Sequence, residues 1–223
     1  MTASIDDRRM RTFTIVPIAA WFAAAFLSGV LDVVNQPGRS PTVLLGFLVV
    51  PTAGFVAAYL MSPRFRAFAN GLPLTLLVGS HLWRFVGVGF VIGWMVGALP
   101  GGFGIPEGVG DIVAALGALL LLPGLMKGRA PRGWLLAWNT FGLVDLVSAI
   151  VVGLLYSEST LGVLSPGTPT TRIMATFPVS LIPTFFVPLF ILLHLLTFKR
   201  IGDIAAPRAS VEARGGERRP APA

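Results

Sequence analysis

Six long apolar segments restrict what this chain can fold into more than any other feature. They cover roughly residues 13–34, 42–62, 72–98, 106–126, 133–156 and 173–198. A helix needs about 20 mostly apolar residues to cross the hydrocarbon core of a bilayer. None of the segments alternates apolar and polar residues as a membrane barrel strand does. Because backbone groups in lipid must hydrogen-bond within their own segment, we predict an all-α, polytopic transmembrane bundle of six helices.

The overall composition excludes a soluble globular protein and a disordered chain. Of the 223 residues, 54% are hydrophobic and only 12% are charged. Soluble domains carry about 25% charged residues, and a disordered chain needs an even more polar composition. There is no cysteine, so disulfides, thiolate metal sites and thiol nucleophiles are excluded as well.

The basic residues predict how the bundle is oriented. Fourteen of the 17 lysines and arginines lie before the first segment, in the second and fourth loops, or after the last segment. The opposite side has only Arg39 and Arg172, and Arg84 lies within a segment. This asymmetry follows the positive-inside rule. We therefore expect a multi-pass protein of the bacterial cytoplasmic (inner) membrane with both termini cytoplasmic.

The same patterns divide the chain into three parts. We expect residues 1–12 to be a cytoplasmic tail, residues 13–200 to be the six-helix domain, and residues 201–223 to be a disordered cytoplasmic tail.

The net charge of +7 would suggest a nucleic-acid partner in a soluble protein, but no basic run is interleaved with aromatic residues. We expect the anionic phospholipid bilayer to be the partner, and we expect no binding of nucleic acid.

Glycines in the third segment indicate close helix packing. Gly89, Gly93 and Gly97 recur every four residues, a spacing that lets another helix approach closely. Packing within the bundle is the first interpretation. The alternative is that these glycines form the face of a homodimer or of a contact with another membrane protein.

Ionisable residues inside membrane segments are expensive and indicate function by default. Counting residues places Arg84 and Asp145 at a similar depth, roughly 18 Å from the cytoplasmic boundary. We therefore predict that they face the bundle interior and pair with each other. Two interpretations stay open: a static ion pair, or a gated pair on a ligand or proton pathway.

Three further polar residues are expected closer to the cytoplasm. His81 precedes Arg84 by three residues, and Asn139 and His194 lie near the cytoplasmic ends of the fifth and sixth segments. Two histidines raise the alternative of a bis-histidine haem. Their expected depths, about 14 and 8 Å, differ too much to favour it. We expect no cofactor and no metal site.

A third group of acidic residues is expected near the outer surface. It comprises Asp32, Glu107 and Asp111, and Asp111 ends the string Gly108-Val109-Gly110-Asp111. This string matches the GxGD motif of intramembrane aspartyl proteases, in which a second aspartate would be Asp32 or Asp145. The alternative is that Asp111 lies at the start of a helix, where the dipole favours its charge.

Four strings carry a resemblance to a known group of proteins. They are His81-Leu-Trp-Arg84, Gly110-Asp111, Trp138-Asn139-Thr-Phe-Gly142-Leu-Val-Asp145 and Ile182-Pro-Thr-Phe-Phe-Val-Pro-Leu-Phe-Ile-Leu-Leu-His194. They resemble strings in small six-helix bacterial membrane proteins known only as hypothetical proteins. The similarity spans roughly residues 20–200 and implies no activity. It does imply that the polar residues of all four strings belong to one constellation, although the position of His81 often holds a different polar residue.

These observations lead to one leading functional hypothesis and several alternatives. The leading hypothesis is a non-enzymatic protein that binds or transports a small ligand or protons through a polar bundle interior. Arg84 would hold an anionic group, Asp145 would be its counter-ion, and Asn139 with His194 would form a cytoplasmic gate. His81 and Asp111 complete the predicted pathway. The alternatives are an intramembrane carboxylate enzyme, a haem- or quinone-binding subunit, and a structural subunit of a membrane complex.

Overall fold

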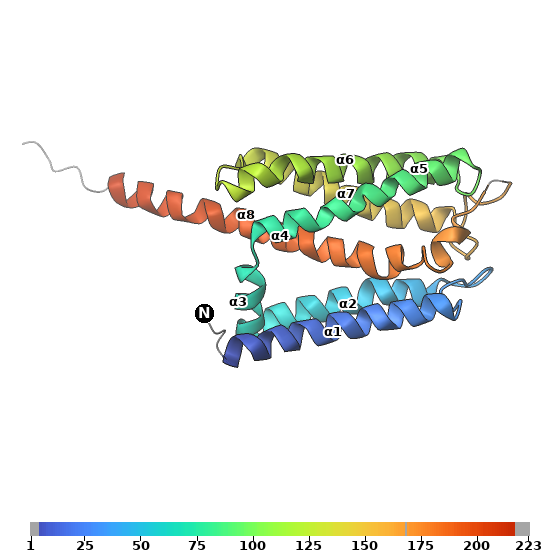
Figure 1. Ribbon diagram of the computed structural model, residues 1–223, viewed down its shortest axis with the longest axis horizontal. Coiled ribbons are helices and arrows are strands. Elements are labelled where there is room, and N and C mark those ends of the chain that lie inside the picture. Colours follow the sequence, from blue (N-terminus) through green and yellow to red (C-terminus); the bar gives the residue numbers. More distant parts are fainter. Residues whose placement is uncertain (1–4, 168, 217–223) are drawn as a thin grey trace, which may run out of the picture.

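The structure is a computed structural model that describes residues 5–167 and 169–216, with side chains described for residues 15–167 and 169–202. Within this part every element of regular secondary structure is a helix, and there is no strand (Figure 1). Its elements are α1 (Ile5–Val30), α2 (Thr42–Met61), α3 (Pro63–Gly71), α4 (Leu74–Gly79), η1 (Ser80–Val86), α5 (Gly87–Met95), α6 (Gly101–Met126), α7 (Arg132–Leu155), η2 (Arg172–Ala175), η3 (Ile182–Phe186) and α8 (Val187–Gly216).

Five helical stretches are long and apolar enough to cross a membrane, which confirms a membrane-type helical bundle. They are Thr42–Met61, Leu74–Met95, Gly101–Met126, Arg132–Leu155 and Ile182–Gly202. The part of α1 with described side chains, Ile15–Val30, is a shorter apolar helix. A sixth crossing by α1 therefore stays a prediction.

The last membrane helix differs from its predicted position at both ends. After the short 3₁₀-helix η2, residues 176–180 of the predicted segment 173–198 form a bend and turns, and the long helical stretch begins only at Ile182. Proline lacks the backbone donor that a helix interior requires; Pro178 lies among these turns, and Pro183 lies in the first turn of η3. At the other end α8 continues to Gly216, where the sequence predicts a disordered tail from residue 201. Residues 1–4 and 217–223 of the two predicted tails lie outside the described residues.

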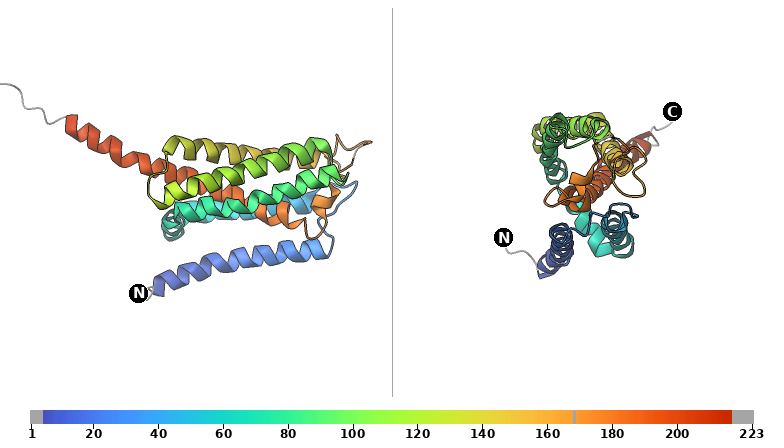
Figure 2. Two further views of the ribbon diagram at one scale, coloured as in Figure 1. Left: turned by 45° about the horizontal axis from the view of Figure 1, so that its top comes forward. Right: turned by 90° about the vertical axis from the view of Figure 1, so that its right-hand side faces the viewer.

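The long helices lie roughly parallel, with α8 between two groups. The views of Figure 2 show α1 and α2 on one side of α8 and α6 with α7 on the other. α8 contacts both α2 and α7. The short helix α3 crosses one end of the bundle between α2 and α4 (Figure 1). The first turns of α1 and the last turns of α8 lie at this same end.

One contact anchors α1 to the irregular start of the last membrane helix. Pro188 has no N–H, so it leaves the carbonyl of Thr184 without its usual helical donor. The indole Nε1 of Trp21 donates to this carbonyl at 3.0 Å. A neighbouring helix thus satisfies a backbone acceptor that lipid could not satisfy. The ring of Trp21 also packs on Phe185, with ring centroids 4.7 Å apart.

The backbones of α5 and α6 approach each other closely. The glycines that allow this approach differ from those that the sequence predicts. A Cβ added at Gly108 would lie 2.7 Å from the carbonyl oxygen of Gly87, and one at Gly104 would lie 2.9 Å from the carbonyl oxygen of Phe90. Of the predicted glycines, a Cβ at Gly93 would lie 2.9 Å from the side chain of Leu99, whereas one at Gly89 would meet nothing within 4 Å. Gly97 has a φ of +74° and ends the helix in a turn. The close contact between α5 and α6 therefore uses Gly87, Gly104 and Gly108, and of the predicted glycines only Gly93 is closely packed among the described residues.

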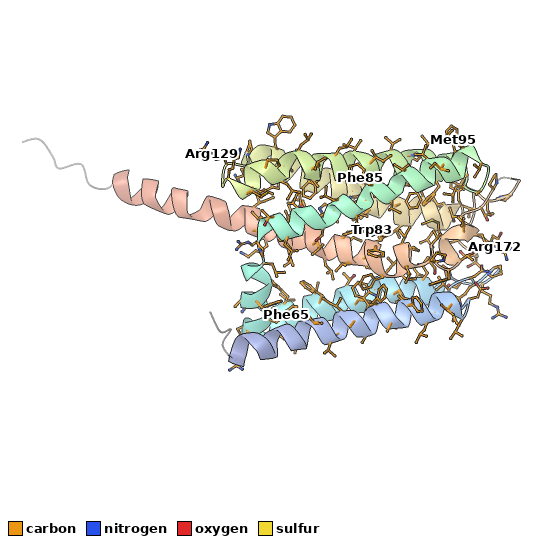
Figure 3. The ribbon with its side chains drawn as sticks, in the orientation of Figure 1. Phe65, Trp83, Phe85, Met95, Arg129 and Arg172 are labelled. Carbon is orange, nitrogen blue, oxygen red and sulfur yellow. The ribbon has the colours of Figure 1, made fainter. Side chains whose placement is uncertain are left out.

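Side chains are distributed in the way expected for a protein surrounded by lipid. Large apolar residues are exposed on the helices, for example Leu120 at 79% and Met95 at 71% (Figure 3). Polar and charged residues are instead buried in the interior, including His81, Arg84, Glu107, Asn139 and His194. Ionisable side chains avoid hydrocarbon and collect where they can pair. The fold therefore places one polar cluster at its centre.

Candidate functional site

The backbone of η1 aligns three residues toward the interior. A 3₁₀-helix has three residues per turn, so residues i and i+3 lie directly above one another. His81, Arg84 and Gly87 follow this spacing, and all three are buried. The glycine allows α6 to approach, while the other two side chains extend between α6, α7 and α8. This short stretch thus presents an imidazole and a guanidinium on one line.

Arg84 binds two carboxylates and one carbonyl, and it is only 1% exposed. Its Nε donates to Oδ1 of Asp111 on α6 at 2.6 Å. Its Nη2 donates to the carboxylate of Asp145 on α7. Its Nη1 donates to the carbonyl oxygen of Gly142 at 3.1 Å. The predicted contact between Arg84 and Asp145 is confirmed, and Asp111, which the sequence places in an outer layer, joins the same guanidinium.

Two glycines provide the space for this arrangement. A Cβ at Gly110 on α6 would collide with the carboxylate of Asp145. A Cβ at Gly142 on α7 would lie 2.7 Å from Nε2 of His194 and 3.1 Å from Nη1 of Arg84. The second glycine of the Gly108-Val-Gly-Asp111 string therefore accommodates the ion pair, which explains the motif without a protease.

The two histidines lie against each other at the next level of the cluster. Their ring centroids are 4.1 Å apart, and neither residue is exposed. The predicted mismatch in depth is therefore wrong. Because α8 continues beyond the predicted segment end at residue 198, His194 lies deeper than expected. A bis-histidine haem needs iron and porphyrin between the two rings, and rings in direct contact do not provide that arrangement.

Asn139 determines which nitrogen of His194 carries the hydrogen. Its amide oxygen lies 2.8 Å from Nδ1 of His194, and its Nδ2 donates to the carbonyl oxygen of His194 at 3.0 Å. Because an amide oxygen only accepts hydrogen bonds, Nδ1 is the donor, and Nε2 of the neutral ring is left as an acceptor. Among the described residues, Nε2 of His194 and both ring nitrogens of His81 have no hydrogen-bond partner.

Glu107 extends the cluster by one turn. It lies four residues before Asp111 on α6, is only 2% exposed, and accepts a hydrogen bond from Ser148 of α7 at 2.9 Å. Ser148 follows Asp145 by three residues, so both lie on the same face of α7. The sequence places Glu107 with the outer acidic residues but not among the candidate site residues. Its position four residues before Asp111, about one helical turn away, is the sequence signal that could have placed it among the site residues.

Asp32 is not part of the cluster. It follows α1 in a turn, has a φ of +53°, and its carboxylate lies 3.4 Å from the side-chain amide of Asn35. Within the described residues, no hydrogen bond or ion pair joins it to Asp111. The aspartate pair that the structure does bring to one place is Asp111 with Asp145, and the guanidinium of Arg84 contacts both.

Comparison with known proteins identifies a family and no activity. No curated protein and no solved structure matches the chain. A family model described as a domain of unknown function (DUF8737) matches residues 41–202. This range includes α2 to η3, the part of α8 that contains His194, and every residue of the polar cluster. Because the match covers most of the 223 residues, the chain belongs to this DUF8737 family of unknown function.

Proposed function

We propose that this chain is a multi-pass protein of the bacterial inner membrane that binds protons in its central polar cluster and passes them across the membrane. One observation carries this proposal: a single buried guanidinium is shared by Asp111 and Asp145, with a third carboxylate, that of Glu107, one turn away. With all three carboxylates ionised, the cluster would hold two uncompensated negative charges. Such charges are costly inside a membrane protein, and a bound proton removes one of them.

The occupancy of Arg84 favours protons over an anionic ligand. Its guanidinium already donates to two carboxylates and to the carbonyl of Gly142. An anion at this position would have to displace a carboxylate, and the displaced carboxylate would then lose its partner. The role of anion holder that the sequence suggests for Arg84 is therefore less favoured than a role in holding the carboxylates in place.

Polar groups continue from the cluster toward the end of the bundle at which α6 begins, opposite the end that α3 crosses (Figure 1). Glu107 and Ser148 form the next level beyond Asp111 and Asp145. A small cavity of about 90 Å³ lies beyond them, and its lining includes Phe103, one turn from Glu107, and Ala149, the neighbour of Ser148. This cavity is the place where water would reach the carboxylates from the side that the positive-inside rule assigns to the exterior.

Polar groups also continue in the opposite direction along α8. The unpartnered Nε2 of His194 lies beside Gly142, as does Nη1 of Arg84. The buried Thr197 follows three residues later, and Arg200 three residues after that, toward the end that α3 crosses. Residues three apart lie on neighbouring positions of one helix face. This order of groups supports a proton route between His194 and the cytoplasmic surface.

The carboxylate-enzyme alternative is less well supported by the same contacts. Two aspartates that activate water share a proton between them because their charges repel. Here a guanidinium compensates that repulsion, so the pair does not need to share a proton in order to lie close together. The contacts of Arg84 thus support a binding role more than a hydrolytic one.

The proposal is tested with the purified full chain in liposomes that contain a pH-sensitive dye. A potassium gradient with valinomycin supplies the driving force, and the rate of internal pH change is measured. We expect a faster change than in empty liposomes, and we expect Asp145→Asn to reduce the rate to that of empty liposomes. Infrared difference spectroscopy would detect the carboxyl group that carries the proton.

A matched control separates the cluster from acidic residues in general. Asp32→Asn removes one carboxylate outside the cluster and is expected to leave the rate unchanged. Glu107→Gln, which keeps a hydrogen-bonding group for Ser148, is expected to slow it. Equal rates for the wild-type protein, for Asp145→Asn and for empty liposomes would contradict proton transfer.

A further inference from the structure

A second cavity, which none of the residues of the polar cluster lines, lies among α1, α2, α3 and α8. This cavity has a volume of about 640 Å³ and is lined only by apolar and aromatic residues. Its size is within the range of about 300–1,000 Å³ typical of pockets for organic ligands. Val50 lines it and is 69% exposed, so the cavity reaches the surface of the bundle.

The cavity is elongated along the membrane helices. On α2 its lining runs from Val43 to Ala58, which are 15 residues apart. At 1.5 Å per residue this corresponds to about 22 Å. One leaflet of the hydrocarbon core is about 15 Å thick, half of the whole. The space is therefore long enough for one extended hydrocarbon chain that lies parallel to α2.

The short helix α3 lies at one end of this cavity and is amphipathic. Phe65, Phe68 and Ala69 line the cavity from the α3 side. Ser62 begins the helix by accepting a hydrogen bond from the backbone N–H of Phe65 at 3.2 Å, and Pro63 occupies the first turn. An amphipathic helix that crosses the end of a membrane bundle has the geometry of an interfacial helix. It therefore places its polar residues at the level of lipid headgroups.

Arginines surround this end of the cavity. Arg64 and Arg66 flank Phe65 on α3, and Arg64 is exposed. Arg200 follows Leu196, a lining residue of α8, by one helical turn and so lies on the same face. The Nε of Arg200 is buried and has no hydrogen-bond partner among the described residues. Three arginines are thus neighbours, in sequence or on one helix face, of residues that line this end of the apolar cavity.

From this complementarity we infer that the cavity is a specific binding site for one anionic phospholipid. The acyl chain lies between α2 and α8, and the phosphate-containing headgroup lies at Arg64, Arg66 and Arg200. The negative headgroup compensates the arginines, and the chain fills apolar space that water would enter only at a cost. The site goes beyond the proposed function because none of its residues belongs to the polar cluster, and Arg200 is the one residue that it shares with the proposed proton route.

Native mass spectrometry of the purified full chain tests the site. The protein is titrated in detergent with dioleoyl phosphatidylglycerol or with dioleoyl phosphatidylcholine, and the population with one bound lipid is measured. We expect phosphatidylglycerol to bind about tenfold more tightly, since each basic residue near an anionic headgroup adds attraction. Replacing Arg64 and Arg66 by glutamine is expected to remove most of this preference.

The cavity itself is tested by filling it. Gly54 lines the cavity, and a Cβ there would meet nothing within 4 Å, so Gly54→Phe places a ring in the space without a backbone clash. We expect this variant to lose binding of both lipids. Gly89→Phe is the matched control, because Gly89 also has open space but lies on α5, outside the cavity.

A second control addresses the charges. Arg129 and Arg132 are exposed arginines at the same end of the bundle but on the opposite side from Phe65 (Figure 3 labels Arg129 and Phe65). Their replacement by glutamine should leave the preference for phosphatidylglycerol intact. Three results would overturn the inference: equal binding of both lipids by the wild type, equal binding by Gly54→Phe and Gly89→Phe, or a wild-type dimer that Gly54→Phe dissociates, because then a second copy fills the cavity.

Discussion

The Nε of Arg84 lies 2.6 Å from Oδ1 of Asp111, although the two residues come from η1 and α6 and the sequence pairs Arg84 only with Asp145. The guanidinium therefore connects three elements: η1, α6 and α7. A single cation with two carboxylates behaves differently from a simple pair. Of the two carboxylates in contact with Arg84, removal of one leaves the other paired with the guanidinium, whereas removal of the guanidinium leaves both without compensation.

This difference predicts a graded series of variants. Arg84→Gln is expected to lower the free energy of unfolding by about 3–5 kcal/mol, because it leaves uncompensated buried charge. Adding Asp145→Asn should restore part of the stability, and adding Asp111→Asn as well should restore most of it. Thermal unfolding in detergent measures the series. Equal stability of the double and triple variants would show that Asp111 does not depend on the guanidinium.

The glycines of α5 and α6 lead to a second prediction. A Cβ at Gly108 would lie 2.7 Å from the carbonyl oxygen of Gly87, a backbone atom that cannot move aside. Gly108→Ala is therefore expected to destabilise the bundle by about 1–3 kcal/mol. Gly89→Ala meets open space and should be neutral or stabilising by up to about 1 kcal/mol. If the order is reversed in an unfolding experiment, Gly89 packs against another chain, as the predicted homodimer face would require.

The two histidines allow fold and function to be separated. Both ring nitrogens of His81 lack a described partner, and its ring packs against Trp138 and Phe190. His81→Phe should therefore change the free energy of unfolding by less than about 1.5 kcal/mol. His194→Phe leaves the amide oxygen of Asn139 without its donor and should cost about 1–3 kcal/mol. Unfolding and liposome assays are measured together. A stable His81→Phe protein with wild-type proton transfer would exclude His81 from the route.

The orientation of the bundle can be tested because the chain contains no cysteine. Ser40→Cys and Lys127→Cys place single thiols at exposed positions in loops at opposite ends of the bundle. The positive-inside rule predicts that a membrane-impermeant maleimide labels only the first variant in intact bacterial cells. Labelling of the second variant before permeabilisation would invert the predicted orientation.

The number of crossings has its own test. With six crossings, reporter proteins fused ahead of Met1 and behind Ala223 should both be cytoplasmic. The reporters are chosen so that they are fluorescent or active on one side of the membrane only. An external reporter at the first fusion with a cytoplasmic one at the second would leave five crossings, and α1 would not span the bilayer.

Most of the fold could be predicted because hydropathy is a local property. The predicted segments 42–62 and 133–156 match α2 and α7 to within about one residue at each end. The segment 72–98 corresponds to α4, η1 and α5 in sequence, but nothing in it indicates the 3₁₀ stretch that aligns His81 with Arg84. The start of the last membrane helix was harder to predict, because apolar residues continue through the turns before Ile182.

Errors of a few residues at helix ends explain most of what was missed in the site. α6 begins at Gly101 instead of at residue 106, so Asp111 is ten residues inside the helix and not at its outer end. α8 continues past residue 198, so His194 lies deep enough to contact His81. The predicted pairing of Arg84 with Asp145 is less sensitive to errors in the helix ends, because both residues lie near the centres of their segments.

The sequence by itself determined that the chain is a membrane-type helical bundle and which few polar residues are enclosed in it, because the transfer of each side chain into lipid contributes nearly independently of the others. Only the tertiary structure decided which of those residues meet. That outcome depends on how far each helix is rotated and shifted against its neighbours, and contacts between residues distant in sequence, such as Gly108 with Gly87 and Gly110 with Asp145, set both.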